Sequence, residues 1–109
     1  MQLPNADRAV VDPRKVQDYL LSETHPIGRF KAALFLSLGY SSAQWETLRD
    51  DLLGIARAGE AIPGLPSAYG RKYEVDGVLN GPSRRSIPFR TVWIVVDDNP
   101  PKFVTAFPR

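Results

Sequence analysis

Three side chains with useful chemistry lie within the segment His25-Pro-Ile-Gly-Arg-Phe-Lys31. His25, the only histidine of the chain, carries an imidazole, a group that can accept or donate a proton near neutral pH. Arg29 and Lys31 carry positive charges, and a helix that begins in this segment adds unpaired N–H groups. The segment therefore predicts an anion-binding site, with phosphate as the natural ligand. The alternative is that His25 only caps the helix and that Lys31 extends from the edge of the core into solvent.

Two polar residues in the second half of the chain interrupt apolar rows. Arg90 begins a row of apolar residues on one strand face, and Thr105 lies between Phe103 and Phe107 on another. Both are candidates for a functional role, because a buried charge or hydroxyl without a partner is costly. Each also has a purely structural interpretation, since arginine often emerges at a strand end and threonine is a good strand former.

Tyr69 and Arg71 pair an aromatic ring with a cation near the start of the first long strand that we expect. Aromatic and cationic side chains together can hold a nucleobase. These two residues are therefore candidates for substrate binding.

The composition is that of one globular domain. The chain has 109 residues, of which 43% are hydrophobic and 24% charged, enough for one core and too few for two. It has no cysteine, which excludes disulfides, thiolate metal sites and cysteine nucleophiles, and one histidine is too few for a histidine-based metal site. We expect no metal and no other cofactor.

Charge and hydropathy restrict the setting in which the chain works. A net charge of +2 favours contact with a phosphate backbone and is equally typical of ordinary solubility. No apolar run has the length of a membrane span or of the core of a signal peptide. We expect a cytoplasmic protein that does not enter a membrane.

Three helices are expected in residues 1–60, from their caps and their apolar spacing. Proline or serine begins each of them and glycine follows the second and third, so we expect helices over 13–22, 26–38 and from 41 or 42 to about 59. Lys31 falls at the edge of the buried stripe of the second helix. The expected stripes are Val16, Tyr19 and Leu20 in the first helix, Ile27, Phe30, Leu34 and Leu38 in the second, and Trp45, Leu48, Leu52 and Ile55 in the third.

A β half is expected over 68–109. Residues 61–67 contain two prolines and a glycine, so we expect them to connect the two halves. Period-two alternation then predicts strands over 69–79, 87–96 and 103–107, and residues 9–11 form a possible short edge strand. Short turns imply an antiparallel meander. The predicted fold class is α+β: one domain over 1–109, with two to three N-terminal helices packed on a meander of three to four strands.

Five patches of the sequence resemble an uncharacterised family of bacterial domains of about this length, a domain of unknown function. Their order and spacing agree over nearly the whole chain. The patches are Leu3-Pro-Asn-Ala, His25-Pro-Ile-Gly-Arg-Phe-Lys31, Tyr69-Gly70 with Tyr73, Arg90-Thr-Val-Trp93-Ile94-Val95, and Phe103-Val-Thr105-Ala-Phe-Pro108.

More loosely, the chain resembles the barnase/EndoU/colicin/RelE superfamily of small ribonucleases, which commonly serve as effectors of toxin–antitoxin or contact-dependent systems. The resemblance rests on the helices followed by a meander, the early histidine and lysine, the strand arginine and the threonine of the last strand. It implies a metal-independent endoribonuclease in which His25 removes the ribose 2′-OH proton while Lys31 and Arg90 stabilise charge on the phosphate. The product would be a 2′,3′-cyclic phosphate. With one histidine, the chain departs from enzymes that use a two-histidine acid/base pair.

The same resemblance implies roles in binding for further residues. Thr105 would hydrogen-bond a phosphate oxygen, Arg29 would help to bind the substrate, and Tyr69, Arg71 or Trp93 would stack on a base. The implied partners are RNA and a small cognate antitoxin or immunity protein.

Two other functional classes fit these residues. One is a non-catalytic interaction module that binds a small partner, and the other is an antitoxin or immunity-type protein that sequesters an effector. A modestly basic chain is a less natural inhibitor of a cationic nuclease than an acidic one.

Overall fold

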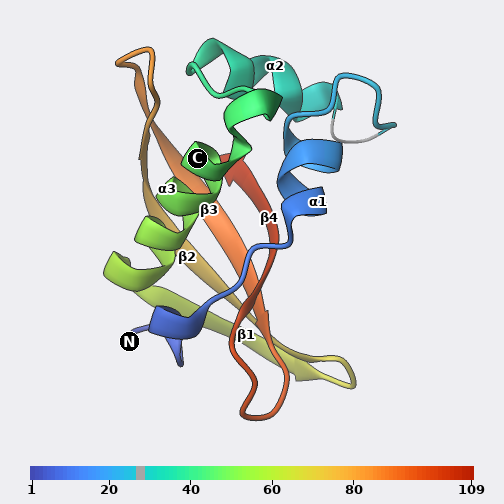
Figure 1. The fold of residues 1–109 in the computed structure, drawn as a ribbon. Helices are drawn as coiled ribbons and strands as arrows, with labels where there is room; N and C mark the ends of the chain where they lie inside the picture. Colours follow the sequence, from blue (N-terminus) through green and yellow to red (C-terminus); the bar gives the residue numbers. More distant parts are fainter. Residues whose placement is uncertain (27–28) are drawn as a thin grey trace.

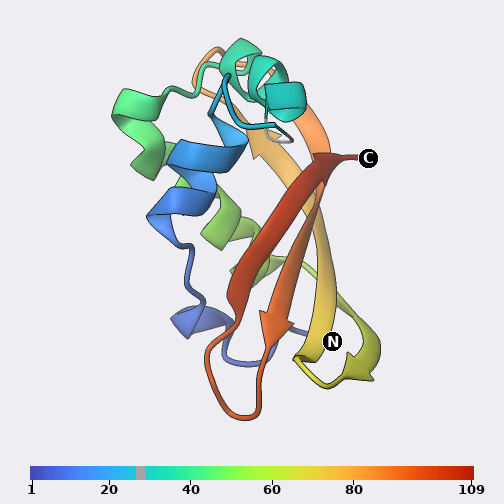
Figure 2. The same ribbon diagram turned by 90° about the vertical axis from the view of Figure 1, so that its right-hand side faces the viewer.

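A computed structural model describes residues 1–26 and 29–109, and the side chains of 1–26 and 31–109. A four-stranded antiparallel sheet lies on one side and the helices gather on the other (Figures 1 and 2). The strand order β1-β2-β3-β4 follows the chain, which confirms the predicted α+β class and the meander. The elements are η1 Ala6–Arg8, α1 Pro13–Lys15, η2 Val16–Leu20, α2 Arg29–Ser37, η3 Ser42–Gln44, α3 Trp45–Ala58, β1 Ala61–Ser67, β2 Gly70–Asn80, β3 Ser86–Val95 and β4 Lys102–Pro108.

The first helix is shorter than predicted and contains a wide turn. Asp12 caps α1 by accepting a hydrogen bond from the backbone N–H of Arg14 at 2.9 Å. The chain then widens into the π-helical segment η2, where the N–H of Leu21 donates to the carbonyl of Val16, five residues back. Single π turns of this kind are frequent at functional sites.

The predicted stripe is confirmed at Leu38, which is fully buried just after α2, but it lacks Phe35. Phe35 is fully buried and stacks on Phe89 of β3 with 5.3 Å between ring centroids, while Leu34 is only half-buried. Both leucine and phenylalanine fit a helical stripe, and packing against β3 selects the phenylalanine. Because Lys31 lies one turn before Phe35, it shares the edge of the buried face. Two predicted core positions lie outside the described side chains, namely Ile27 and Phe30.

Helix α3 has the predicted packing face. Ser41 caps the turn that leads into it by accepting a hydrogen bond from the N–H of Gln44 at 3.3 Å. Trp45 is half-buried and packs against the core, with the guanidinium of Arg49 at 5.1 Å from the centre of its ring. The predicted core residues that are buried are Leu48, Leu52 and Ile55.

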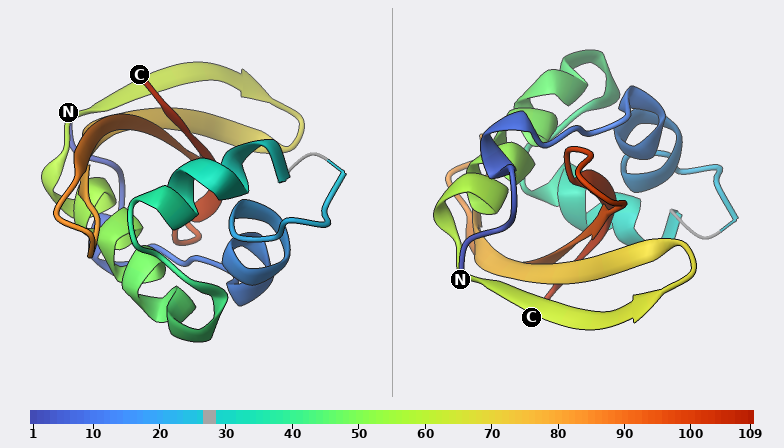
Figure 3. Two further views of the ribbon diagram at one scale, coloured as in Figure 1. Left: turned by 90° about the horizontal axis from the view of Figure 1, so that it is seen from above. Right: turned by 90° about the horizontal axis from the view of Figure 1, so that it is seen from below.

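Residues 61–67 form strand β1, so the prediction of a connector there is wrong. Proline is tolerated in β1 because it is an edge strand, where a missing N–H can face away from the ladder. The register with β2 shifts between Pro63 and Pro66, and only Ala61 of the strand is buried. Figure 3 shows β1 and β2 curving along one side of the molecule, opposite the helices.

The core lies between the helices and the inward face of the sheet. Strands β2 and β3 alternate buried and more exposed residues, as the period-two pattern predicts. None of the helices in the described part of the chain is long and apolar enough to cross a membrane. The buried residues of β2 and β3 are Tyr73, Val75, Leu79, Phe89, Thr91 and Trp93.

Candidate functional site

A cavity of about 780 Å³ lies where α1 and η2 meet β4, which are neighbours in Figure 1. Three of the residues singled out from the sequence line it together: His25, Lys31 and Thr105. They come from the loop before α2, from α2 and from the last strand. The wall holds three cations, from Arg14, Lys15 and Lys31, against two carboxylates, and we call it the cationic cavity. The carboxylates are those of Asp12 and Asp18. The fold thus brings a proton-transfer group and cations to one surface hollow.

Lys31 is at the centre of a small hydrogen-bonded cluster, which we call the lysine cluster: Lys31, Tyr19 and Thr105. The ammonium of Lys31 donates to Thr105 Oγ1 at 2.8 Å and to the hydroxyl oxygen of Tyr19 at 3.1 Å. The two hydroxyl oxygens are 3.4 Å apart. Within the described residues, no carboxylate lies within salt-bridge distance of Lys31. Its charge is therefore solvated by hydroxyls and not neutralised, which suits an anion site.

Two hydrogen-bond donors of the lysine cluster have no acceptor within the cluster. An ammonium has three N–H groups, and the two contacts of Lys31 use two of them. The contact between Tyr19 and Thr105 uses one of the two hydroxyl protons. One ammonium proton and one hydroxyl proton therefore have no acceptor among the described residues. Two such donors side by side can bind a phosphate oxygen.

Tyr19 is polarised by its surroundings. Burial by itself raises the pKa of Tyr19, but the hydrogen bonds from Thr105 and Lys31 and the charges of Lys31 and Lys15 outweigh it and hold the pKa below its ordinary value. The ammonium groups lie 5.2 Å (Lys31) and 5.9 Å (Lys15) from the centre of the tyrosine ring. Tyr19 is accordingly a better proton donor than an ordinary tyrosine.

The imidazole of His25 stands beside the lysine cluster. Its ring contacts the ring of Tyr19 edge to face, with 5.2 Å between centroids and 71° between the ring planes. The loop that carries it is held by Ser22, whose hydroxyl oxygen accepts a hydrogen bond from the His25 backbone N–H at 3.1 Å. A base and a polarised hydroxyl thus face the same cavity.

A β-bulge in β4 places Thr105 in the cavity. Phe103 and Thr105 pair with consecutive residues of β3, which leaves Val104 as an extra residue in β4. The bulge moves Thr105 out of the row in which we expected it, because Phe103 is buried whereas Phe107 is 38% exposed. The predicted threonine between two phenylalanines on one face is therefore wrong. Bulges commonly re-aim a side chain near an active site.

Arg90 does not line the cavity, so the expectation that it shares one cleft with Lys31 and Thr105 is wrong. Its guanidinium donates twice to Asp76, at 2.8 and 3.1 Å, and forms an ion pair with Glu74 at 2.7 Å. Arg109 also pairs with Asp76. These carboxylates neutralise the charge of Arg90.

Trp93 is a core residue and does not reach the surface. It is fully buried, its indole N–H donates to Thr91 Oγ1 at 2.8 Å, and its ring contacts Phe103 edge to face. The expectation that Trp93 stacks on a nucleobase is wrong, because a base would have to displace the core.

The other predicted binding residues do not line the cavity. Tyr69 is 82% exposed in the turn between β1 and β2, and Arg71 is exposed at the start of β2. Neither lies among the cavity's residues. The side chain of Arg29 lies outside the described residues. The predicted roles of these three residues remain untested expectations.

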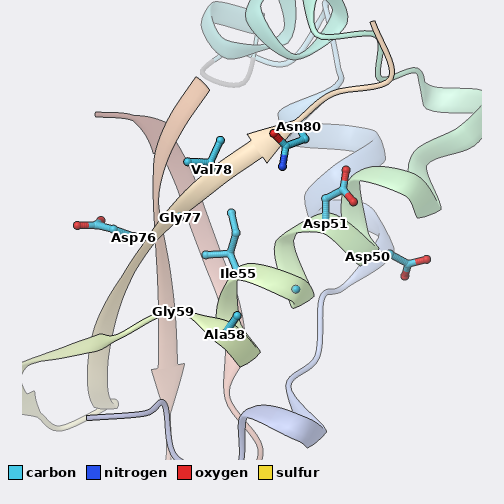
Figure 4. Close-up of a pocket in the computed structure, with 10 residues that line it drawn as sticks. Asp50, Asp51, Ile55, Ala58, Gly59, Asp76, Gly77, Val78 and Asn80 are labelled. Atoms are coloured by element: carbon cyan, nitrogen blue, oxygen red, sulfur yellow. The ribbon is translucent and has the colours of Figure 1, made fainter. Parts of the chain in front are cut away.

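A second hollow, between α3 and β2, has the wrong charge for a phosphate (Figure 4). Three carboxylates line it, from Asp50, Asp51 and Asp76. One of them, Asp51, accepts a 2.6 Å hydrogen bond from the hydroxyl of Tyr40. Among the described residues no group of histidine and carboxylate side chains has the arrangement of a metal site. The cationic cavity is therefore the better candidate site.

Sequence reasoning missed Tyr19 and Lys15. Tyr19 belongs to the expected apolar stripe of the first helix, which gives no role to its hydroxyl. The π-helical turn of η2 lets Val16 and Leu20 stay buried while Tyr19 contacts Thr105 of β4. A tyrosine among aliphatic residues on a short helix was the available signal.

Comparison with known proteins gives a family and a fold. Residues 2–109 match the family model described as a domain of unknown function, DUF6883. A solved structure titled "Contact-dependent growth inhibition toxin - immunity protein complex from Klebsiella pneumoniae 342" contains a chain of similar fold, with a TM-score of 0.74, 18% identity and coverage of 98% of each chain. At that identity the similarity shows the fold alone. No curated protein matches the chain.

Proposed function

This chain belongs to the DUF6883 family of domains of unknown function, and we propose that it is a metal-independent endoribonuclease of toxin type. The observation that carries the proposal is the meeting of His25 with the lysine cluster in one cationic cavity. A general base, a charge-stabilising ammonium and hydroxyl donors are the parts that RNA cleavage by its own 2′-hydroxyl needs.

In the proposed reaction His25 accepts the proton of the ribose 2′-hydroxyl. The 2′-oxygen attacks phosphorus, the bond from phosphorus to the 5′-oxygen breaks, and a 2′,3′-cyclic phosphate is left. The third N–H of Lys31 holds a non-bridging oxygen, where negative charge builds up, while Thr105 donates its hydroxyl proton to the oxygen of Tyr19. A proton for the departing 5′-oxygen comes from Tyr19, whose phenolate Lys31 then stabilises. Tyr19 thus fills the role for which the chain has no second histidine.

The fold supports a role for this domain in a bacterial toxin system. The similar solved chain comes from a complex of a contact-dependent growth inhibition toxin with its immunity protein. In the proposal, the present domain acts on RNA inside a target cell and is neutralised by a small cognate immunity protein or antitoxin. Such a partner would cover a cationic cavity best with acidic side chains.

A second candidate function follows from the same comparison, because the complex contains an immunity protein as well as a toxin. The domain would then be a non-catalytic interaction module or immunity-type protein. The cavity argues against this alternative, since a binding module has no need of an imidazole beside a polarised tyrosine.

Expression of the domain alone in bacteria distinguishes these functions. We expect the wild type to arrest growth and fragment cellular RNA, and His25→Ala to do neither while accumulating as folded protein. Lys72→Ala is the control, because Lys72 is exposed on β2 and lines no cavity described above. Wild-type protein that leaves growth and RNA intact contradicts the nuclease. Protein that rescues cells from a co-expressed effector supports the immunity-type alternative.

A further inference from the structure

A smaller hollow of about 510 Å³ adjoins the cationic cavity along β4. The two share Asp12 and Lys15 in their walls. Lys102 at the start of β4 lines only the smaller one. The shared residues make the two hollows neighbouring parts of one surface.

The smaller hollow has a fixed backbone frame. The N–H of Val10 donates to the carbonyl of Pro101 at 2.9 Å, and the N–H of Phe103 donates to the carbonyl of Val10 at 2.9 Å. These bonds form the parallel bridge of Val10 with Lys102, which holds the segment before α1 against β4. The hollow is therefore part of the fold and does not depend on a loose loop.

Its walls combine an apolar surface with two ammonium groups. Val10 is 48% exposed, and Pro13 and Phe103 complete the apolar part. Neither Lys15 nor Lys102 has a carboxylate within salt-bridge distance among the described residues. A nucleobase that is not base-paired presents an apolar face, and the phosphate beside it needs a cation. An apolar wall with two ammonium groups therefore matches one nucleotide of a single strand.

The acidic member of this wall is already engaged. Both carboxylate oxygens of Asp12 are bonded by Arg14, one to its backbone N–H at 2.9 Å and the other to its guanidinium at 3.1 Å. The Arg14 hydrogen bonds hold the pKa of Asp12 below its ordinary value. Because its charge is offset by Arg14, Asp12 does not cancel the attraction of the two lysines for a phosphate.

We propose that the smaller hollow binds the nucleotide next to the scissile phosphate, with its base on Val10 and Pro13 and its outer phosphate on Lys102. Single-stranded RNA then follows the outer edge of β4, and Lys15 stands between the two subsites. This inference rests on the proposed ribonuclease function and adds a second nucleotide subsite to it.

Binding of short 2′-fluoro RNA oligonucleotides, which lack the attacking hydroxyl, tests the subsite. We compare a dinucleotide with a tetranucleotide by fluorescence anisotropy, using the wild type, Lys102→Ala and the control Arg57→Ala. Arg57 is exposed on α3 and lines neither hollow. Lys102→Ala should weaken tetranucleotide binding roughly two- to fivefold and reduce the salt slope by about 0.7, the value for one phosphate of a single strand. Dinucleotide binding and the Arg57→Ala protein should match the wild type.

Cleavage kinetics separate failure of the subsite from failure of the function. Lys102→Ala should raise KM for RNA and leave kcat unchanged, since the subsite holds substrate without touching the reacting atoms. If the wild type cleaves RNA and Lys102→Ala binds the tetranucleotide with wild-type affinity and salt slope, the subsite is wrong and the nuclease stands. If the wild type neither binds these oligonucleotides nor cleaves RNA, both proposals fall.

Discussion

Replacing Lys31 with methionine separates a functional role from a structural one at the centre of the cavity. Methionine keeps an unbranched side chain of similar size and removes the charge and the N–H groups. The bonds to Thr105 at 2.8 Å and to Tyr19 at 3.1 Å are lost. The two hydroxyls can still bond to each other across their 3.4 Å contact, so neither is left without a partner.

The expected effect on stability is small because two contributions oppose each other. Each lost hydrogen bond from a charged donor removes about 1.5–3 kcal/mol, while relief of the desolvation of a half-buried ammonium returns several kcal/mol. We expect the free energy of unfolding to change by less than about 1 kcal/mol, or about 5 °C in Tm for a domain of this size. The expected loss of kcat is about 10²–10³-fold, as for removal of one charge-stabilising donor.

Thermal unfolding by circular dichroism and single-turnover RNA cleavage measure both quantities on the same protein. Lys72→Met removes the same charge from the exposed side of β2 and should change neither. The reasoning is refuted if Lys31→Met keeps wild-type kcat. It is equally refuted if Tm falls by more than about 10 °C and the remaining activity simply follows the folded fraction, because Lys31 would then be a structural residue.

Three further predictions follow from the described contacts. Thr91→Val removes the buried acceptor of the Trp93 indole N–H and should lower the free energy of unfolding by about 1–3 kcal/mol in urea titrations, and unchanged stability would contradict it. Tyr19→Phe should remove the early part of the alkaline tyrosine absorbance titration and lower kcat, whereas an unaltered titration curve would show that the pKa of Tyr19 is not depressed. The hydrogen bond from Arg90 holds the pKa of Asp76 below its ordinary 3.8, more than burial raises it, so its stabilisation is complete above pH 3.8 and is lost as the pH falls through the folded-state pKa. Asp76→Asn should therefore flatten the acid limb of stability against pH, and an equally steep limb in the variant would count against this ion pair.

Regular alternation and helix caps made most of the fold predictable. The period-two pattern of Tyr73 and Val75 predicts which side of β2 is buried, and Ser41 begins the turn before α3 as its cap indicates. Strand β1 was missed because Pro63 and Pro66 count against a strand wherever the neighbouring chain is unknown. Their position at the sheet edge, where the missing N–H groups cost little, depends on the complete sheet.

The site was only partly predictable because its members are far apart in the chain. Lys31 and Thr105 are 74 positions apart, and their 2.8 Å contact depends on a one-residue bulge that no local pattern announces. His25 and Lys31 could be found by residue type alone. Arg90 was placed wrongly because a polar residue in an apolar row indicates a special position without telling which side chains will pair with it.

His25 is the proposed base in RNA cleavage by the 2′-hydroxyl. The most direct test of this role is incubation of purified wild-type and His25→Ala protein with RNA in the presence of EDTA, followed by analysis of the product ends. We predict fragments ending in a 2′,3′-cyclic phosphate from the wild type, and a rate about 10²–10⁴-fold lower for folded His25→Ala. Intact RNA after incubation with excess wild-type protein, or equal cleavage by the two proteins, would contradict this role.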